Sequence, residues 1–152
     1  MNDKAKAFDG FIEKNGLNWF IKEEHPDEFK TVAYRGHLDL QGERVPLFVV
    51  LDNSVFSFLR IIIPGAGVPA ERRIEAESYL GDLNRRFKCF KYYLDEAEST
   101  IVLDISIPCT AADFNPDTVT GLIGQVLLPH LEEYYAKHKG FYDVVLSDMK
   151  LN

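Results

Sequence analysis

The sequence has few cysteines, no long apolar run and no excess of basic residues. Its 152 residues contain two cysteines, Cys89 and Cys109, without CxxC spacing, which excludes a disulfide-stapled domain and favours a reduced setting. The longest apolar stretches, Pro46–Leu51 and Leu59–Pro64, are too short to span a bilayer, and the charged start of the chain lacks the apolar core of a signal peptide. We therefore expect a cytoplasmic protein without a membrane partner.

The charge of the chain is acidic. The 24 Asp and Glu residues outnumber the 17 Lys and Arg residues, which gives a formal net charge of -7 at pH 7. Because a negative protein repels phosphate backbones, we expect no nucleic-acid partner. Apolar residues make up 46% of the chain and aromatic residues 12%, enough for a hydrophobic core. No linker or repeat interrupts the sequence, so residues 1–152 are expected to form a single domain.

The first half of the chain changes from a helical to an extended pattern. Apolar residues recur at helical spacing within Asp3–Lys14, and Asn15 and Gly16 end this predicted helix. Alternation of apolar and polar residues then predicts four strands separated by polar turns. Their ranges are Leu17–Lys22, Phe29–Leu40, Val45–Leu51 and Val55–Ile63.

The second half begins with a well-marked helix. Pro69 is placed at its start, and the helix extends to Arg86 with Ala76, Leu80 and Leu83 on its buried side. A hairpin follows, because two apolar alternating runs flank a polar turn. Its strands are Phe90–Asp95 and Thr100–Ile107.

A last helix is predicted from Pro116, with Asn115 as its N-cap. Pro129 lacks a backbone donor and should kink or divide this helix, which ends near Gly140. The following tail, Phe141–Leu146, is apolar enough to pack on the domain, as either a helix or a strand.

Several stretches of the sequence resemble a known family. They are Leu59–Pro64, Val68–Arg73, Tyr79–Asn84, Tyr93–Asp95 and Ile101–Pro108. In these motifs and in element order the chain is similar to the YbjN family, whose fold is that of type III secretion chaperones. The resemblance implies a homodimer that binds extended or partly folded protein segments and has no catalytic residue. The predicted fold is α+β, an antiparallel curved sheet with packed helices in the secretion-chaperone-like order α-β(3-4)-α-β-β-α.

Two predicted strands are apolar on both faces. In Val45–Leu51 and Val55–Ile63, one set of alternating residues can face the helices of the same domain. The opposite set needs a second cover, from the remaining helices, a second subunit or a bound peptide. We take this opposite set as a candidate partner-binding face, and it comprises Phe48, Val50, Phe56, Phe58 and Ile62.

Arg72 and Arg73 stand at the start of the predicted second helix, where the helix dipole disfavours positive charge. Two interpretations are open. The arginines pair with neighbours such as Glu75 and Glu77, or they hold an anionic ligand or an acidic partner segment. Both arginines therefore join the candidate partner-binding residues.

The loop Gly65–Ala70 matches the pattern G-x-G-x-x-A between a strand and a helix, as in dinucleotide-binding proteins. Asp95, at the end of the next strand, lies farther along than the pattern requires, and Pro69 starts the helix after the second glycine. A loop that needs a permissive backbone is the competing interpretation. Binding of a small molecule or nucleotide by the segment Gly65–Arg73 is thus the alternative function.

His130, Tyr134 and His138 recur at i, i+4 and i+8 in the last predicted helix. The two histidines are about 12 Å apart in helix rise, too far to share a metal ion, so we expect a solvated helix face.

The sequence has no G-x-S-x-G motif and no serine with an evident base. We expect no enzyme activity, no cofactor and no metal. The expected function is a chaperone-like or regulatory module that binds a protein or peptide segment.

Overall fold

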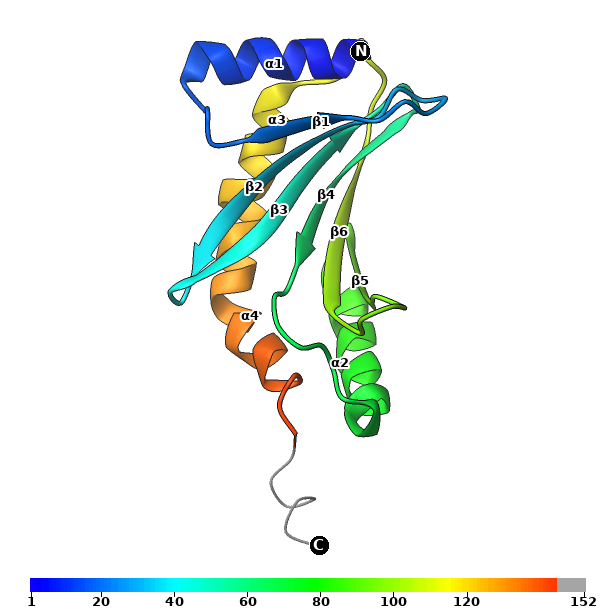
Figure 1. Ribbon diagram of the computed structural model, residues 1–152, viewed down its shortest axis with the longest axis vertical. Helices are drawn as coiled ribbons and strands as arrows, with labels where there is room; N and C mark the ends of the chain where they lie inside the picture. Colours follow the sequence, from blue (N-terminus) through cyan, green and yellow to red (C-terminus); the bar gives the residue numbers. More distant parts are fainter. Residues whose placement is uncertain (145–152) are drawn as a thin grey trace, which may run out of the picture.

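Six antiparallel strands form one sheet in the order β1-β2-β3-β4-β6-β5. The computed structural model describes residues 1–144 (Figure 1). After β4 the chain passes through α2 to the far edge of the sheet, so that β6 returns between β4 and β5. The strands are β1 (Ile21–Glu24), β2 (Val32–Leu40), β3 (Glu43–Leu51), β4 (Phe56–Ile62), β5 (Phe90–Leu94) and β6 (Ile101–Pro108).

The helices among residues 1–144 pack on one face of this sheet. In Figure 1, α1 lies across one end of the sheet, α3 and α4 run behind β2 and β3, and α2 runs behind β5. A 3-10 turn precedes α2, and a π-helical segment joins α3 to α4. The bounds are α1 (Asp3–Asn15), η1 (Ala70–Arg72), α2 (Arg73–Arg86), α3 (Pro116–Gly121), η2 (Leu122–Leu127) and α4 (Leu128–Gly140).

The alternation of burial along the central strands shows which face the helices cover. In β3, Leu47 and Val49 are fully buried, whereas Phe48 and Val50 between them are only half-buried. Alternate residues of a strand point to opposite faces, so the core lies on the helical side alone. The second apolar set is expected to be covered by the remaining helices, a second subunit or a bound peptide. The described helices therefore do not cover it.

The start of α1 is fixed to the sheet by polar side chains. Asn2 caps the helix, and its amide also donates to the Leu51 carbonyl at 3.0 Å. The ammonium of Lys4 is buried and donates to the Ser54 carbonyl at 2.8 Å and to Ser57 Oγ at 3.1 Å. Because buried polar groups must be hydrogen-bonded, this end of α1 has one favourable position on the strands.

The last helix is divided, as its proline predicts. Asn115 Oδ1 accepts from the Asp117 amide at 3.0 Å and caps α3. The helix is π-helical from Leu122 to Leu127 and returns to α-helical geometry at the turn that contains Pro129. Proline has no N–H to donate to the preceding turn, which removes one α-helical hydrogen bond there.

Two predicted strands begin later than expected, and both shifts have local causes. The strand predicted over Leu17–Lys22 is β1, Ile21–Glu24, because Trp19 and Phe20 instead pack their stacked rings against the end of the sheet. The strand predicted over Phe29–Leu40 begins at Val32.

A turn accounts for that second shift. Asp27 accepts from the Thr31 amide at 2.9 Å, and Lys30 has a left-handed φ of 51°.

Farther along the chain, the predicted tail packs on the domain as far as it is described: Phe141 is buried and Tyr142 donates to the Ile63 carbonyl at 2.7 Å. The last part of that tail lies outside the described residues. No helix within residues 1–144 combines the length and the apolar character needed to cross a bilayer.

Candidate partner-binding surface

The face of the sheet opposite the helices carries an apolar patch at its centre, which we call the open-face patch. It consists of Phe48 and Val50 from β3 with Phe58 and Ile62 from β4. Strand register places Val50 directly opposite Phe58, so these side chains are neighbours. The patch lines a shallow pocket of about 350 Å³ together with Glu23, His25, Thr31, Ala33 and Arg60.

Phe56 extends the open-face patch toward one end of β4. Its side chain is 52% exposed, and it lies opposite Pro108 of β6 on the same face as Phe58. The structure thus brings together the five apolar residues singled out from the sequence. Their grouping follows from the pairing of β3 with β4 and from the absence of a described helix on this side.

An ion pair borders the open-face patch. Arg60 Nε and Nη2 donate to the two Asp104 carboxylate oxygens at 2.8 and 3.0 Å, and Tyr93 donates to the same carboxylate at 3.1 Å. The Arg60 guanidinium also lies 4.9 Å from the centre of the Phe58 ring. Hydrogen bonding to Asp104 raises the pKa of Arg60. The charges of Arg60 and Asp104 are therefore paired with each other, so a partner that covers this pair leaves neither of the two charges isolated.

Arg72 and Arg73 lie away from the open-face patch, at the start of α2. Arg72 donates to Glu75 at 3.1 Å and to the Gly140 carbonyl at 2.6 Å, and so joins α2 to the end of α4. Arg73 donates to Glu77 at 3.0 Å. Of the two interpretations, pairing with neighbouring acids is the one that the geometry shows.

The glycine-rich loop before α2 is packed against the chain itself. Gly65 and Gly67 have φ values of 138° and 88°, and a Cβ on Gly67 would overlap the Glu98 carbonyl. The Val68 amide donates to the Ser99 carbonyl at 2.9 Å, and Lys139 donates to the Pro64 carbonyl at 2.6 Å. Close packing of Gly67 against the hairpin turn and of Gly65 against the Tyr142 ring thus accounts for the two glycines without a ligand.

The prediction of a solvated histidine face on the last helix is wrong. His130 and His138 are 7% and 0% exposed, and their Nε2 atoms lie 2.7 and 2.8 Å from the same Tyr92 hydroxyl. Tyr79 bonds the other ring nitrogen of His138 at 3.0 Å. Helix rise separates the backbones, but the side chains converge on one tyrosine between them.

This histidine and tyrosine cluster is held in neutral form. Desolvation lowers the pKa of His130 to about 4 and that of His138 to about 3. A consistent arrangement has Tyr79 donating to His138, His138 donating to Tyr92, and Tyr92 donating to His130. The cluster therefore satisfies its buried polar atoms internally and serves the packing of α4 on β5.

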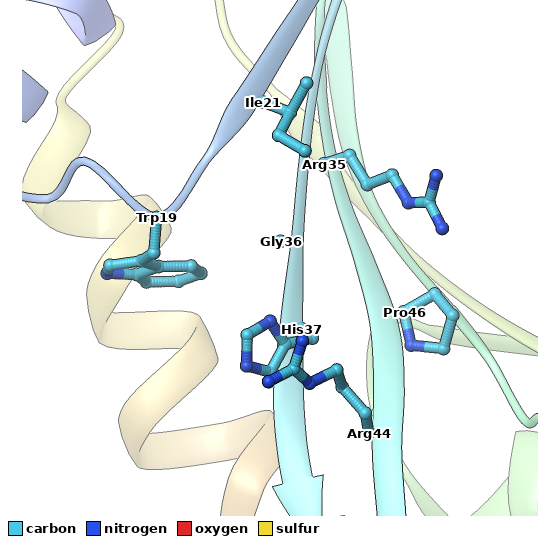
Figure 2. A pocket seen from close by; sticks show the side chains of 7 residues that line it. All are labelled: Trp19, Ile21, Arg35, Gly36, His37, Arg44 and Pro46. Atoms are coloured by element: carbon cyan, nitrogen blue, oxygen red, sulfur yellow. The ribbon is translucent and has the colours of Figure 1, made fainter.

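A second pocket, which the sequence did not suggest, lies at the corner formed by β1, β2 and β3; we call it the corner pocket (Figure 2). Its volume is about 320 Å³. Both apolar and cationic side chains surround it. The lining residues are Trp19, Ile21, Arg35, Gly36, His37, Arg44 and Pro46.

The two cysteines are not paired with each other. Cys89 precedes Phe90, which lies opposite Ile105, so the hairpin register brings Cys89 toward Ser106 rather than Cys109. Both thiols are free.

Comparison with known proteins identifies the fold. No protein-family model and no curated protein matches the chain. A chain of the solved structure described as "Crystal Structure of the ExsC-ExsE Complex" is similar, with a TM-score of 0.55 and 18% sequence identity over 88% of this chain and 94% of that chain. At this identity the likeness shows the fold alone. The predicted α+β fold of secretion-chaperone-like architecture is confirmed, whereas the likeness does not single out the YbjN family.

Proposed function

We propose that this protein binds a segment of another polypeptide on the open face of its sheet, as a chaperone-like or regulatory module that catalyses no reaction. The observation that carries the proposal is the uncovered apolar set at the centre of the sheet, Phe48, Val50, Phe58 and Ile62. Large apolar side chains gathered on one surface are typical of protein interaction sites.

The energetics of the open-face patch favour association. Each 100 Å² of apolar surface removed from water contributes about 2.5 kcal/mol, which must exceed the cost of ordering the partner. The pairing of Arg60 with Asp104 makes covering the patch less costly than burying an unpaired charge would be. A half-buried aromatic such as Phe58, with a guanidinium over its ring, is the kind of rigid contact that often dominates such interfaces.

The proposal includes a homodimer, a cytoplasmic location and a protein partner rather than a nucleic acid. The net charge of -7 supports the last point, since it disfavours binding to phosphate backbones. The fold likeness supports a protein partner, because the similar chain was solved as part of a complex named for ExsC and ExsE. The proposed surface omits Arg72, which joins the start of α2 to the end of α4, and Arg73, which pairs with Glu77 within α2.

The experiment compares two variants that each place a carboxylate on the surface. Phe58→Asp alters the open-face patch, and Ile74→Asp alters an 85% exposed position on α2, away from the sheet. Both should keep a cooperative thermal transition. Affinity capture from the source cells should recover a partner with the wild type and Ile74→Asp but not with Phe58→Asp.

Two results would argue against the proposal. Equal capture by Phe58→Asp would remove the open-face patch from the binding surface. Global unfolding of Phe58→Asp would show that this side chain belongs to the core. Light scattering on the same samples tests the homodimer, which should have twice the 17.4 kDa mass of one chain.

A further inference from the structure

The arginines of the chain divide into two groups. Five of the seven pair with a carboxylate, and those are Arg60, Arg72, Arg73, Arg85 and Arg86. The other two, Arg35 and Arg44, have no ion pair, hydrogen bond or ring contact with any residue of the described chain. Both line the corner pocket. In a protein of net charge -7, the two guanidiniums without a partner thus lie in the same place.

The carboxylates nearest in sequence or register are directed elsewhere. Asp39 lies opposite Arg44 in the β2–β3 ladder but is 3.9 Å from His37. Glu43 precedes Arg44 and pairs with Lys139 at 3.1 Å. Arg35 and Arg44 therefore have no ion-pair partner within the described chain, and an acidic group from outside would complement them.

The corner pocket is also apolar on the side of Trp19. The indole ring lies against Gly36, where a Cβ would overlap the ring, and it remains 42% exposed. Ile21, at the start of β1, is 69% exposed. Figure 2 shows Trp19 on one side of β2 and the side chains of Arg35, His37 and Arg44 around the strand. A ligand here meets apolar surface and positive charge together.

One edge of β2 is open beside this pocket. β1 pairs with β2 only over Val32–Arg35, whereas β2 continues to Leu40. No strand among residues 1–144 pairs with Gly36–Leu40 on that side, and Figure 1 shows this end of β2 at the margin of the sheet. Such an edge offers unpaired backbone donors and acceptors to an extended peptide.

We propose that the corner pocket and the open edge of β2 bind an extended, acidic segment of a partner polypeptide. Its backbone pairs with Gly36–Leu40, and its carboxylates meet Arg35 and Arg44. This inference rests on the proposed function and adds the chemistry of the bound segment. The two surfaces are continuous, because Arg35 lies directly opposite Phe48 of the open-face patch.

Charge argues against a second copy of this chain as the occupant. A two-fold contact through the corner pocket would bring the same pair of unpaired arginines from each subunit together. The backbone edge argues against a small anion, which would use the charges and leave the edge donors of β2 without a partner.

The test uses the fluorescence of Trp19, the single tryptophan of the chain. The probe is a short peptide that alternates glutamate and valine, because in a strand all its carboxylates lie on one face. Peptides that alternate glutamine and valine, or that carry N-methyl groups on the backbone, are the matched probes. Arg35→Gln and Arg44→Gln are compared with Arg85→Gln, an exposed arginine on α2 that pairs with Asp82.

The glutamate peptide should change the Trp19 emission saturably, and less at high salt. Each of Arg35→Gln and Arg44→Gln should weaken binding by about tenfold, and the glutamine and N-methylated peptides should bind at least about tenfold more weakly. Arg85→Gln should bind as the wild type does.

Three results would overturn the inference. The first is that the glutamine peptide binds as tightly as the glutamate peptide. The second is that inorganic phosphate changes the Trp19 emission as much as the glutamate peptide does. The third is that the arginine variants change the oligomeric mass of the protein but do not weaken peptide binding. The two proposals fail separately. If Phe58→Asp loses partner capture but the glutamate peptide does not change the Trp19 emission, only the proposal of an acidic segment is rejected. If the peptide changes the Trp19 emission but Phe58→Asp still captures the partner, only the proposal that the open-face patch binds the partner is rejected.

Discussion

The two faces of the central strands are similarly apolar in sequence but differ in what covers them. On one face Leu59 and Ile61 are buried beneath the helices, and on the other Phe58 and Ile62 remain half-buried. Adjacent residues of one strand thus have opposite surroundings. The comparison teaches that the sequence of a strand can show that both of its faces are apolar. Which of the two faces is buried within the chain depends on where the helices pack.

The neighbours Leu59 and Phe58 provide the largest test of this difference. Leu59→Ala should lower the free energy of unfolding by about 2–5 kcal/mol, since it leaves a cavity in the core. Phe58→Ala should cost about 1 kcal/mol or less, because its side chain is already partly in water. Urea unfolding of both variants measures the two costs. Equal costs would mean that the two faces are equally buried.

The pH dependence of stability sharpens the comparison, because the buried histidines lie on the covered side. In the unfolded chain each histidine takes up a proton below its ordinary pKa of 6.5, whereas burial keeps the folded pKa near 4 for His130 and near 3 for His138. The unfolded state therefore binds more protons as the pH falls, and stability decreases between pH 6.5 and those folded values.

Unfolding measured between pH 7 and pH 5 should show this loss, which approaches about 1.4 kcal/mol per pH unit for each histidine. His138→Gln should have a shallower slope, because this ring is fully buried in the folded chain. An unchanged slope in His138→Gln would contradict the buried neutral state of that ring.

The ion pair on the open face should have a smaller effect. Asp104→Asn should lower the unfolding free energy by about 1–2 kcal/mol, because Arg60 loses its charged acceptor. The Arg60 side chain is 37% exposed, so solvent limits the cost. The double variant Arg60→Leu, Asp104→Leu should recover stability in thermal melts. A double variant less stable than Asp104→Asn would show that the pair contributes more than its replacement by packing.

The smallest effect on folding is expected at the exposed end of the open-face patch. Phe56→Ser should change the unfolding free energy by no more than about 0.5 kcal/mol, since the ring is 52% exposed. Partner capture should nevertheless decrease, because the variant removes an apolar contact. Chemical denaturation and capture of the same sample would separate the two readouts. A large loss of stability without a loss of capture would contradict the surface assignment.

Much of the fold could be predicted because its signals are local. Proline at the start of helices, glycine at the end of α1 and alternation along β3 and β4 each act within a few residues. The two displaced strand starts also have local causes, the turn at Asp27 and the packing of Trp19, but these depend on side-chain choices that periodicity does not report.

The candidate sites were predictable only in part, because they depend on contacts between distant residues. The open-face patch could be identified from alternation alone, although its exposure required knowledge of where the helices pack. The histidine cluster depends on Tyr92 of β5, far from α4 in sequence. The corner pocket depends on the shortness of β1 and on the lack of a side chain at Gly36, which leaves room for the Trp19 ring. No sequence motif indicates either feature.

Site-specific photo-crosslinking tests the central claim most directly. A benzophenone amino acid replaces Phe58 in one sample and the exposed Ile74 in another, and both are irradiated in the source cells. The account predicts a covalent adduct with a second, different polypeptide from position 58 and none from position 74. An adduct from position 74 alone, or only an adduct between two copies of this chain from position 58, would contradict it.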